Sequence, residues 1–361
     1  SADNVNLIKI FDDGSFQTVT LGTSNLRLGL NAGNSIASGG NYNVVVGDEA
    51  GTALTTGDGN VAVGFEALKT EDANGLNVAI GYQALETLNA GADAYNVAVG
   101  SNAGTAMTTG VRNTILGGNA GDGLTTGSNN VAVGAFSLGT DDLGTENTAV
   151  GYNTLSALNF ATATTSYNTA VGARAGEAVT TGLNNTLIGA LAGDALTDAD
   201  HNTAVGRGSL GADTLGSRAV AVGFGALSSQ NFTTATDNYN VAVGFNAGVL
   251  VSTGTNNTFV GGLAGDATDD GNDNVAIGHQ ALSANAGDDN VAIGKDALLV
   301  NVKNQNIAIG SHALDSDVNG GTSVAIGHNA LQAQAPATAT DMYNVAVGNS
   351  AGASVTGSRG D

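Results

Sequence analysis

The chain has 361 residues, of which 55 are Gly and one is Pro, and it contains no Cys. Ten basic residues against 32 acidic ones give a formal net charge of −22, which excludes the basic patches that nucleic-acid binding needs. Without Cys there is no disulfide framework, and no apolar run approaches the roughly 18 residues of a membrane span. We therefore expect neither nucleic acid as a partner nor direct membrane insertion by this segment.

Residues 1–24 carry two short apolar runs, at 7–11 and 16–21, on either side of an Asp-Asp-Gly-Ser turn sequence. This pattern is typical of a β-hairpin. We predict that the hairpin caps the first coil of the repeats that follow, because an uncapped solenoid exposes a strand edge.

Residues 25–352 repeat one short phrase nineteen times: an Asn, three mostly apolar residues and a Gly. The closing Gly runs from Gly29 to Gly348, usually in steps of 17 residues. A unit this short cannot bury a core alone, so the coils must stack and share one. The repeat therefore predicts an all-β solenoid of about nineteen coils. Residues 353–361 read as the start of a further coil, and we expect the chain to continue.

Alternation within the phrase predicts two faces. The residues three and one before each Gly are Val, Ile, Leu or Thr, and we assign them to the interior of the coil. The residue between them is Ala in 14 of 19 coils and is expected to point outward, against copies of the same chain. A second layer within one chain is the alternative. The interface candidates are Ala62, Ala79, Ala98, Ala132 and Ala149.

The opening Asn predicts a structural ladder, because stacked amides can hydrogen-bond the coils above and below. Asn opens the phrase in 17 of 19 coils, with Ala219 and Ser323 as the exceptions. Representative ladder residues are Asn60, Asn77, Asn96, Asn113 and Asn130.

A longer period lies over the single coil. The fourth residue after each phrase Gly is Gly or Leu, in the order Gly, Gly, Leu, Leu, so that four coils form a super-repeat, which the fourth group extends to six coils with two more Leu. The second Gly coil carries a bulky residue in place of the usual Ala, at Val45, Ile115, Leu187 and Phe259. Volume lost at one position is regained at the other, as a close-packed interior requires.

The phrase followed by a small residue, as in NVAIGHQA at 274–281, closely resembles the head repeat of trimeric autotransporter adhesins. It is also similar to repeats of bacteriophage tail-fibre proteins. The resemblance covers about residues 25–352. It implies a left-handed parallel β-roll in an intertwined or side-by-side homotrimer, with apolar contacts along the trimer axis. The row of Ala residues is what such an interface would need.

Catalytic and metal-binding patterns are weak. The spacing implies no Ser-His-Asp or paired-carboxylate site, and we expect no enzymatic activity. Asp-rich stretches offer the oxygen ligands that calcium prefers, although solvated acidic loops are the interpretation we favour. The calcium candidates are Asp269, Asp270, Asp273, Asp288 and Asp289, and no other cofactor is expected.

These features favour an extracellular fibre on a bacterial cell surface or a virion. We expect an adhesin or tail-fibre segment that attaches to a cell through a glycan or protein receptor. The enlarged loops at 159–166, 231–238 and 334–342 are the expected recognition sites. The alternative is a purely structural spacer, a filament or sheath component without a receptor site of its own.

Overall fold

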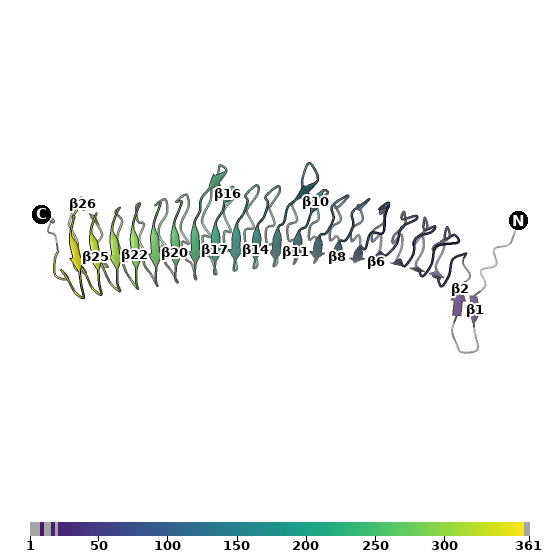
Figure 1. Cartoon of the computed structure of the whole chain (residues 1–361), viewed down its shortest axis with the longest axis horizontal. Coiled ribbons are helices and arrows are strands. Elements are labelled where there is room, and N and C mark those ends of the chain that lie inside the picture. The colour runs from purple at the N-terminus through teal and green to yellow at the C-terminus, as the bar shows by residue number, and fades with distance from the viewer. Residues whose placement is uncertain (1–7, 11–15, 19–20, 357–361) are drawn as a thin grey trace. The chain divides into compact units, whose positions relative to one another are not determined.

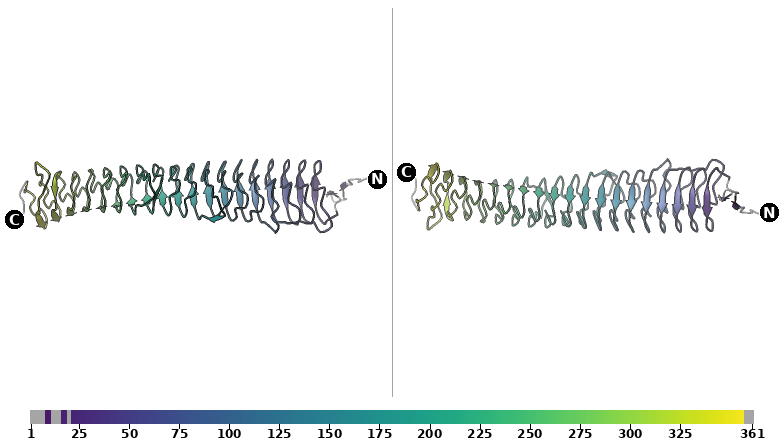
Figure 2. Two further views of the ribbon diagram at one scale, coloured as in Figure 1. Left: turned by 90° about the horizontal axis from the view of Figure 1, so that it is seen from above. Right: turned by 90° about the horizontal axis from the view of Figure 1, so that it is seen from below.

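The computed structural model describes residues 8–10, 16–18 and 21–356. The chain forms two compact units, Ser1–Arg174 and Ala175–Asp361, and each is a stack of coils (Figure 1, Figure 2). The described residues contain strands and turns but no helix, and therefore no helix able to cross a membrane. Counted together, the coils make a parallel β-solenoid of about nineteen turns, as the repeat predicts.

Each coil contributes one three-residue strand, which pairs in parallel with its neighbours in the same unit. In the first unit the strands are β3 (Leu26–Leu28), β4 (Val44–Val46), β5 (Val61–Val63), β6 (Val78–Ile80), β7 (Val97–Val99), β8 (Thr114–Leu116), β9 (Val131–Val133), β11 (Thr148–Val150) and β13 (Thr169–Val171). In the second unit they are β14 (Thr186–Ile188), β15 (Thr203–Val205), β17 (Val220–Val222), β19 (Val241–Val243), β20 (Thr258–Val260), β21 (Val275–Ile277), β22 (Val291–Ile293), β23 (Ile307–Ile309), β25 (Val324–Ile326) and β27 (Val345–Val347). The register places phrase on phrase, so that Val61 lies between Val44 and Val78.

Three pairs of two-residue strands belong to the enlarged loops. They are β10 (Gly144–Thr145) with β12 (Thr164–Thr165), β16 (Gly216–Ser217) with β18 (Thr236–Asp237), and β24 (Gly320–Gly321) with β26 (Thr340–Asp341). All three pairs are parallel. Each one joins an enlarged loop to the coil that precedes it.

The strands of the predicted N-terminal hairpin are present. β1 (Ile8–Ile10) and β2 (Phe16–Thr18) pair antiparallel, and β2 contacts β3 at the start of the solenoid. The turn between them, at 11–15, lies outside the described residues. Residues 357–361, within the segment predicted to begin a further coil, lie outside them as well.

The phrase Gly directly follows each strand, and its backbone lies close to the phrase Gly of the next coil. Gly64 has a φ of +135°, and a Cβ built there would lie 2.2 Å from the carbonyl oxygen of Gly81 in the next coil. Any side chain at this position would push the coils apart. This close approach explains why the phrase always closes on Gly.

The Ala face of each strand is the interior of the coil, which is the reverse of the sequence-based assignment. The five alanines proposed as interface residues are fully buried within a single chain: Ala62, Ala79, Ala98, Ala132 and Ala149. Alternate strand residues point to opposite sides, so Val61 and Val63 face outward and stay partly exposed. The alanines cannot line an interface between chains, because their own coil already covers them.

The Gly and Leu coils fill the same narrow interior in two ways. In both Gly and Leu coils, the residue six positions after the inward-facing strand residue has a left-handed backbone conformation. Its φ is +50° at Gly51 and +51° at Leu68. In Leu coils the buried Leu occupies the space beside the Ala. In the second Gly coil the larger inward residue occupies it, and a Cβ at Gly265 would lie 2.6 Å from the ring of Phe259. The predicted exchange of volume is therefore a direct contact.

Candidate functional site

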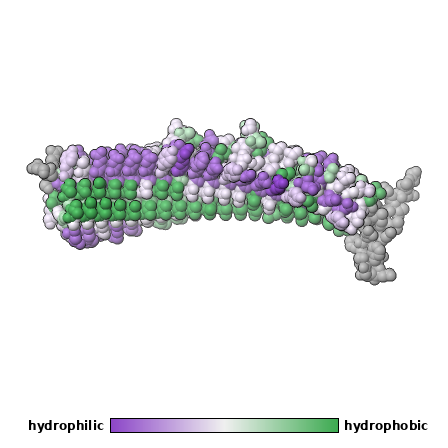
Figure 3. Space-filling model, in the orientation of Figure 1, coloured by the Kyte–Doolittle hydropathy of each residue, from purple (hydrophilic) through white to green (hydrophobic). Residues whose placement is uncertain are grey.

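Two rows of side chains point outward along the strands of each unit, one apolar throughout and the other Val, Ile or Leu in thirteen coils and Thr in six. The row that follows the buried position is Val, Ile or Leu in every coil. Most members of both rows are partly exposed, and Ile80, Leu116, Ile188 and Ile277 are 37–40% exposed. Figure 3 shows apolar bands along the coils on the side where β14 and β20 are seen in Figure 1. Continuous apolar surface of this kind marks an interaction site.

The asparagines do form a ladder inside the coils. The residues named above as its representatives, Asn60, Asn77, Asn96, Asn113 and Asn130, are all fully buried. Asn96 Oδ1 accepts the backbone N–H of Asn113 at 2.9 Å, and Asn113 Oδ1 accepts that of Asn130 at 2.9 Å. The Nδ2 of Asn113 donates to the Gly127 carbonyl at 2.9 Å. The shorter bonds thus run from side chain to backbone, whereas bonds between amides were expected.

A loop side chain replaces the missing acceptor of the ladder at Ala219. Ala219 offers no side-chain acceptor, and Asn238 Oδ1 accepts the N–H of Asn240 at 2.9 Å instead. At the other exception, Ser323 Oγ accepts a hydrogen bond from Gln334 Nε2 at 3.1 Å. Asn238 and Gln334 both belong to enlarged loops. Sequence reasoning missed this role, although the Asn two residues before Asn240 was a visible signal.

The enlarged loops are held at their bases. Figure 1 shows the loops at β10 and β16 standing out from the coils around them. In the second unit, Arg218 Nε lies 2.9 Å from Asp237 Oδ1, and its guanidinium lies 5.8 Å from the centroid of the Tyr239 ring. The ion pair and the cation–π contact tie the 231–238 loop to the preceding coil.

A buried carboxyl group lies beneath each enlarged loop. Asp141, Asp213 and Asp317 are fully buried, and each lies three residues after the Leu of its coil. The sequence signal for them was an acidic residue at the same position in the coil before each enlarged loop. This position lies outside the repeated phrase, so the phrase alone does not reveal it.

Hydrogen bonds to these carboxyl groups come from the loop and from a glutamine. Asp213 Oδ1 accepts the N–H groups of Gly216 at 3.0 Å and Phe232 at 3.1 Å. Its Oδ2 accepts Gln230 Nε2 at 2.6 Å. Gln334 Nε2 likewise lies 2.6 Å from Asp317 Oδ2. Burial raises the pKa of Asp317, and the bond from Gln334 acts in the opposite direction.

Two of the calcium candidates accept hydrogen bonds from neighbouring coils. Asp288 Oδ1 accepts the backbone N–H of Asn272 at 2.8 Å, and Asp269 accepts a bond from the Ser252 hydroxyl. In the part of the chain that the structure describes, no three His, Cys, Asp or Glu side chains are grouped so that they could hold a metal ion. The hydrogen bonds of Asp269 and Asp288 to neighbouring coils fit the interpretation of these stretches as acidic loops, and a calcium site at Asp269, Asp270, Asp273, Asp288 and Asp289 stays a weak candidate.

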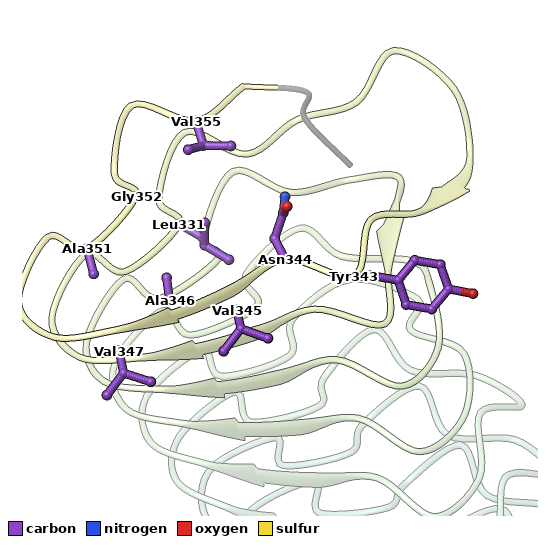
Figure 4. Close-up of a pocket in the computed structure, with 9 residues that line it drawn as sticks. All are labelled: Leu331, Tyr343, Asn344, Val345, Ala346, Val347, Ala351, Gly352 and Val355. Atoms are coloured by element: carbon purple, nitrogen blue, oxygen red, sulfur yellow. The ribbon is translucent and has the colours of Figure 1, made fainter. Parts of the chain in front are cut away.

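The second unit contains an open hollow of about 530 Å³ beside β27 (Figure 4). Leu331 and Ala346 lie toward the inside of the coil, while Val345 and Val347 are 73% and 68% exposed. Among the described strands, β27 pairs only with β25. The hollow is thus the uncovered end of the coil interior, and it lacks the convergent polar groups of a small-molecule site.

Comparison with known proteins assigns no family. Neither a scan of protein families nor a search of curated proteins produced a match to this chain. The geometry establishes a parallel β-solenoid of about nineteen coils, with outward apolar rows and loops anchored over buried carboxyl groups.

Proposed function

We propose that this chain is a segment of an extracellular attachment fibre on a bacterial surface or a virion. Three copies assemble side by side as left-handed β-rolls, and the enlarged loops contact a glycan or protein receptor on a cell. The observation that carries the proposal is the outward apolar face, which recurs in every coil of both units. Covering apolar surface is favourable by about 25 cal/mol per Å².

A second copy of the chain is the partner that suits this face. Parallel strands in one sheet are about 4.8 Å apart, so the outward rows repeat with that spacing along each unit. A parallel copy carries the same repeat and can interdigitate with these rows at every coil. Head-to-tail contacts around a closed ring use the same two flanks of every subunit, which is compatible with three chains.

The oligomeric state tests the assembly. We expect the chain to sediment at equilibrium as a trimer, and the triple variant Val133→Lys, Val150→Lys, Val171→Lys to sediment as a folded monomer, because these outward side chains are partly exposed. Thr126→Lys places one charge on an exposed turn and is the control. A wild-type monomer would rule out the trimer, and a trimeric triple variant would place the interface elsewhere.

Ala149→Lys tests whether the interface is the outward Val and Ile face or the Ala row. Ala149 is fully buried, so a lysine there should unfold the coil instead of merely dissociating the trimer. Circular dichroism distinguishes the two results. If Ala149→Lys gives a folded monomer, the Ala row is exposed after all.

Loop trimming tests the attachment role. Shortening 159–166, 231–238 and 334–342 to the length of an ordinary coil should abolish binding of labelled trimer to cells while leaving the trimer intact. Binding of the wild-type trimer and of the trimmed trimer is measured on the same cell type. Unchanged binding, or no binding by the wild-type chain, would favour the structural spacer.

A further inference from the structure

The buried carboxyl groups beneath the enlarged loops differ at one neighbouring position. Gln230 and Gln334 each follow their Asp by 17 residues and donate to its Oδ2. The residue 17 positions after Asp141 is Leu158, whose side chain cannot donate a hydrogen bond. Asp141 Oδ1 accepts the Gly144 N–H at 2.9 Å, but its Oδ2 is buried with no partner among the described residues.

The surroundings of Asp141 disfavour its charge. Burial is the main cause that raises the pKa of Asp141 to about 6, and the charge of the adjacent Asp142 adds to it, while the backbone bond from Gly144 opposes it. Asp122 in the preceding coil lies beside Gly139 and is a second acidic group on that side. The following coil contributes no charged residue between 155 and 164. No cation therefore offsets the charge of Asp141.

The 159–166 loop is connected to this carboxyl group through β10. Gly144, which donates to Asp141, is the first residue of β10, and β10 pairs with β12 in the loop. Phe160 at the start of the loop is buried, as is Phe232 at the equivalent place in the second unit. There the Phe232 N–H bonds the Asp directly. By this equivalence, we take the start of the 159–166 loop as the segment that moves when water reaches Asp141.

We propose that the 159–166 loop is anchored in a proton-dependent manner. It stays on its coil while Asp141 is protonated and opens as Asp141 ionises, whereas the 231–238 loop keeps its anchor through Gln230. Opening lets water solvate the Oδ2 atom that has no partner in the closed loop. This behaviour does not depend on whether the loop contacts a receptor.

The direction of the effect follows from proton linkage. A carboxyl group with a higher pKa in the closed loop than in water binds more protons in the closed state. Closure is therefore favoured at low pH and is lost as the pH rises through about 6. If the open loop restores the ordinary value of 3.8, the closed-to-open ratio falls about tenfold between pH 5 and pH 8.

Hydrogen exchange of the full chain tests the proposal, with labelling times corrected for the intrinsic pH dependence of exchange. Peptides that cover 159–166 should lose about tenfold in protection between pH 5 and pH 8, while those that cover 231–238 in the same sample should not change. Leu158→Gln supplies the missing donor and should remove the pH dependence. Asp141→Asn should remove it as well.

The reciprocal variant keeps the test decisive if either of these fails to fold. Gln230→Leu should make the 231–238 loop respond to pH as the 159–166 loop does. Equal responses of the two wild-type loops would overturn the proposal. A pH dependence of 159–166 that persists in both Leu158→Gln and Asp141→Asn would overturn it too.

Discussion

The Asn and the Gly of the phrase determine the contacts between equivalent residues of consecutive coils. The buried amide of Asn113 occupies a backbone acceptor and a backbone donor of neighbouring coils, so it satisfies groups that the strands leave unpaired. The phrase Gly admits a backbone approach that no side chain permits. The Gly recurs in every coil and the Asn in 17 of 19, and both roles were visible in the sequence because a stacked repeat places equal positions on one another.

Asn113→Ala tests the ladder. The N–H of Asn130 and the carbonyl of Gly127 lose their partners while buried, and we expect a loss of about 2 kcal/mol in the free energy of unfolding. Asn129→Gly is the matched control, since Asn129 is exposed and its φ of +58° suits Gly. Urea denaturation of both variants measures the difference. Equal midpoints would show that the ladder contributes nothing to stability.

Asn238 makes a contact that the repeat alone does not predict. A gap at Ala219 predicts a weak point in the ladder, yet a residue of the 231–238 loop supplies the acceptor. The sequence places Asn238 near Asn240 but does not say that the loop folds back onto the coil. Only the path of the loop decides which amide lies within reach.

At the scale of the coil, one interior volume is filled by either of two positions. Phe259 contacts Gly265 of its own coil and Gly248 of the coil before it, so the large inward side chain needs Gly on both. Ala276 is followed by Leu282 at the same spacing, and there both are fully buried. The order of Gly and Leu coils is thus a packing pattern, which accounts for its regularity.

Moving the large side chain from the inward strand position to the position six residues later tests this packing pattern. Phe259→Ala leaves a cavity and should cost about 3–5 kcal/mol, and Gly265→Leu alone should clash with the Phe259 ring. The double variant reproduces the arrangement of Ala276 with Leu282, so it should recover about half of the summed loss. A double-mutant cycle from denaturant midpoints gives the coupling. Additive losses would mean that the two positions do not share one space.

At the scale of the molecule, each coil contacts only its neighbours, so stability is a sum of coils and of interfaces between them. Removing a whole super-repeat should preserve the order of Gly and Leu coils. Deletion of 97–168 joins Asn96 to Thr169 and removes four complete coils. We expect a folded chain with a β-rich circular dichroism spectrum and a cooperative melt. Deletion of 97–160 leaves a step of 27 residues from Gly81 to Gly172, longer than any other in the chain, and is the comparison that should melt at a lower temperature.

The sequence by itself determined the number of coils, the stacking of phrase on phrase, the Asn ladder and the exchange of volume between Gly265 and Phe259. Each is a relation between equal positions of a periodic chain, and the period states it directly. The sequence also showed that the strand has two unlike faces. It did not show which face the coil encloses, because alternation is the same on both sides of a strand.

The tertiary structure decided that question. Each coil closes over one short strand, so the space beside it holds an Ala together with the Leu that returns from the same coil, as Ala276 and Leu282 do. The β-branched Val and Ile residues are too large for both rows to share that interior, and they turn outward. The face exposed by this choice is the one through which we propose that copies of the chain assemble.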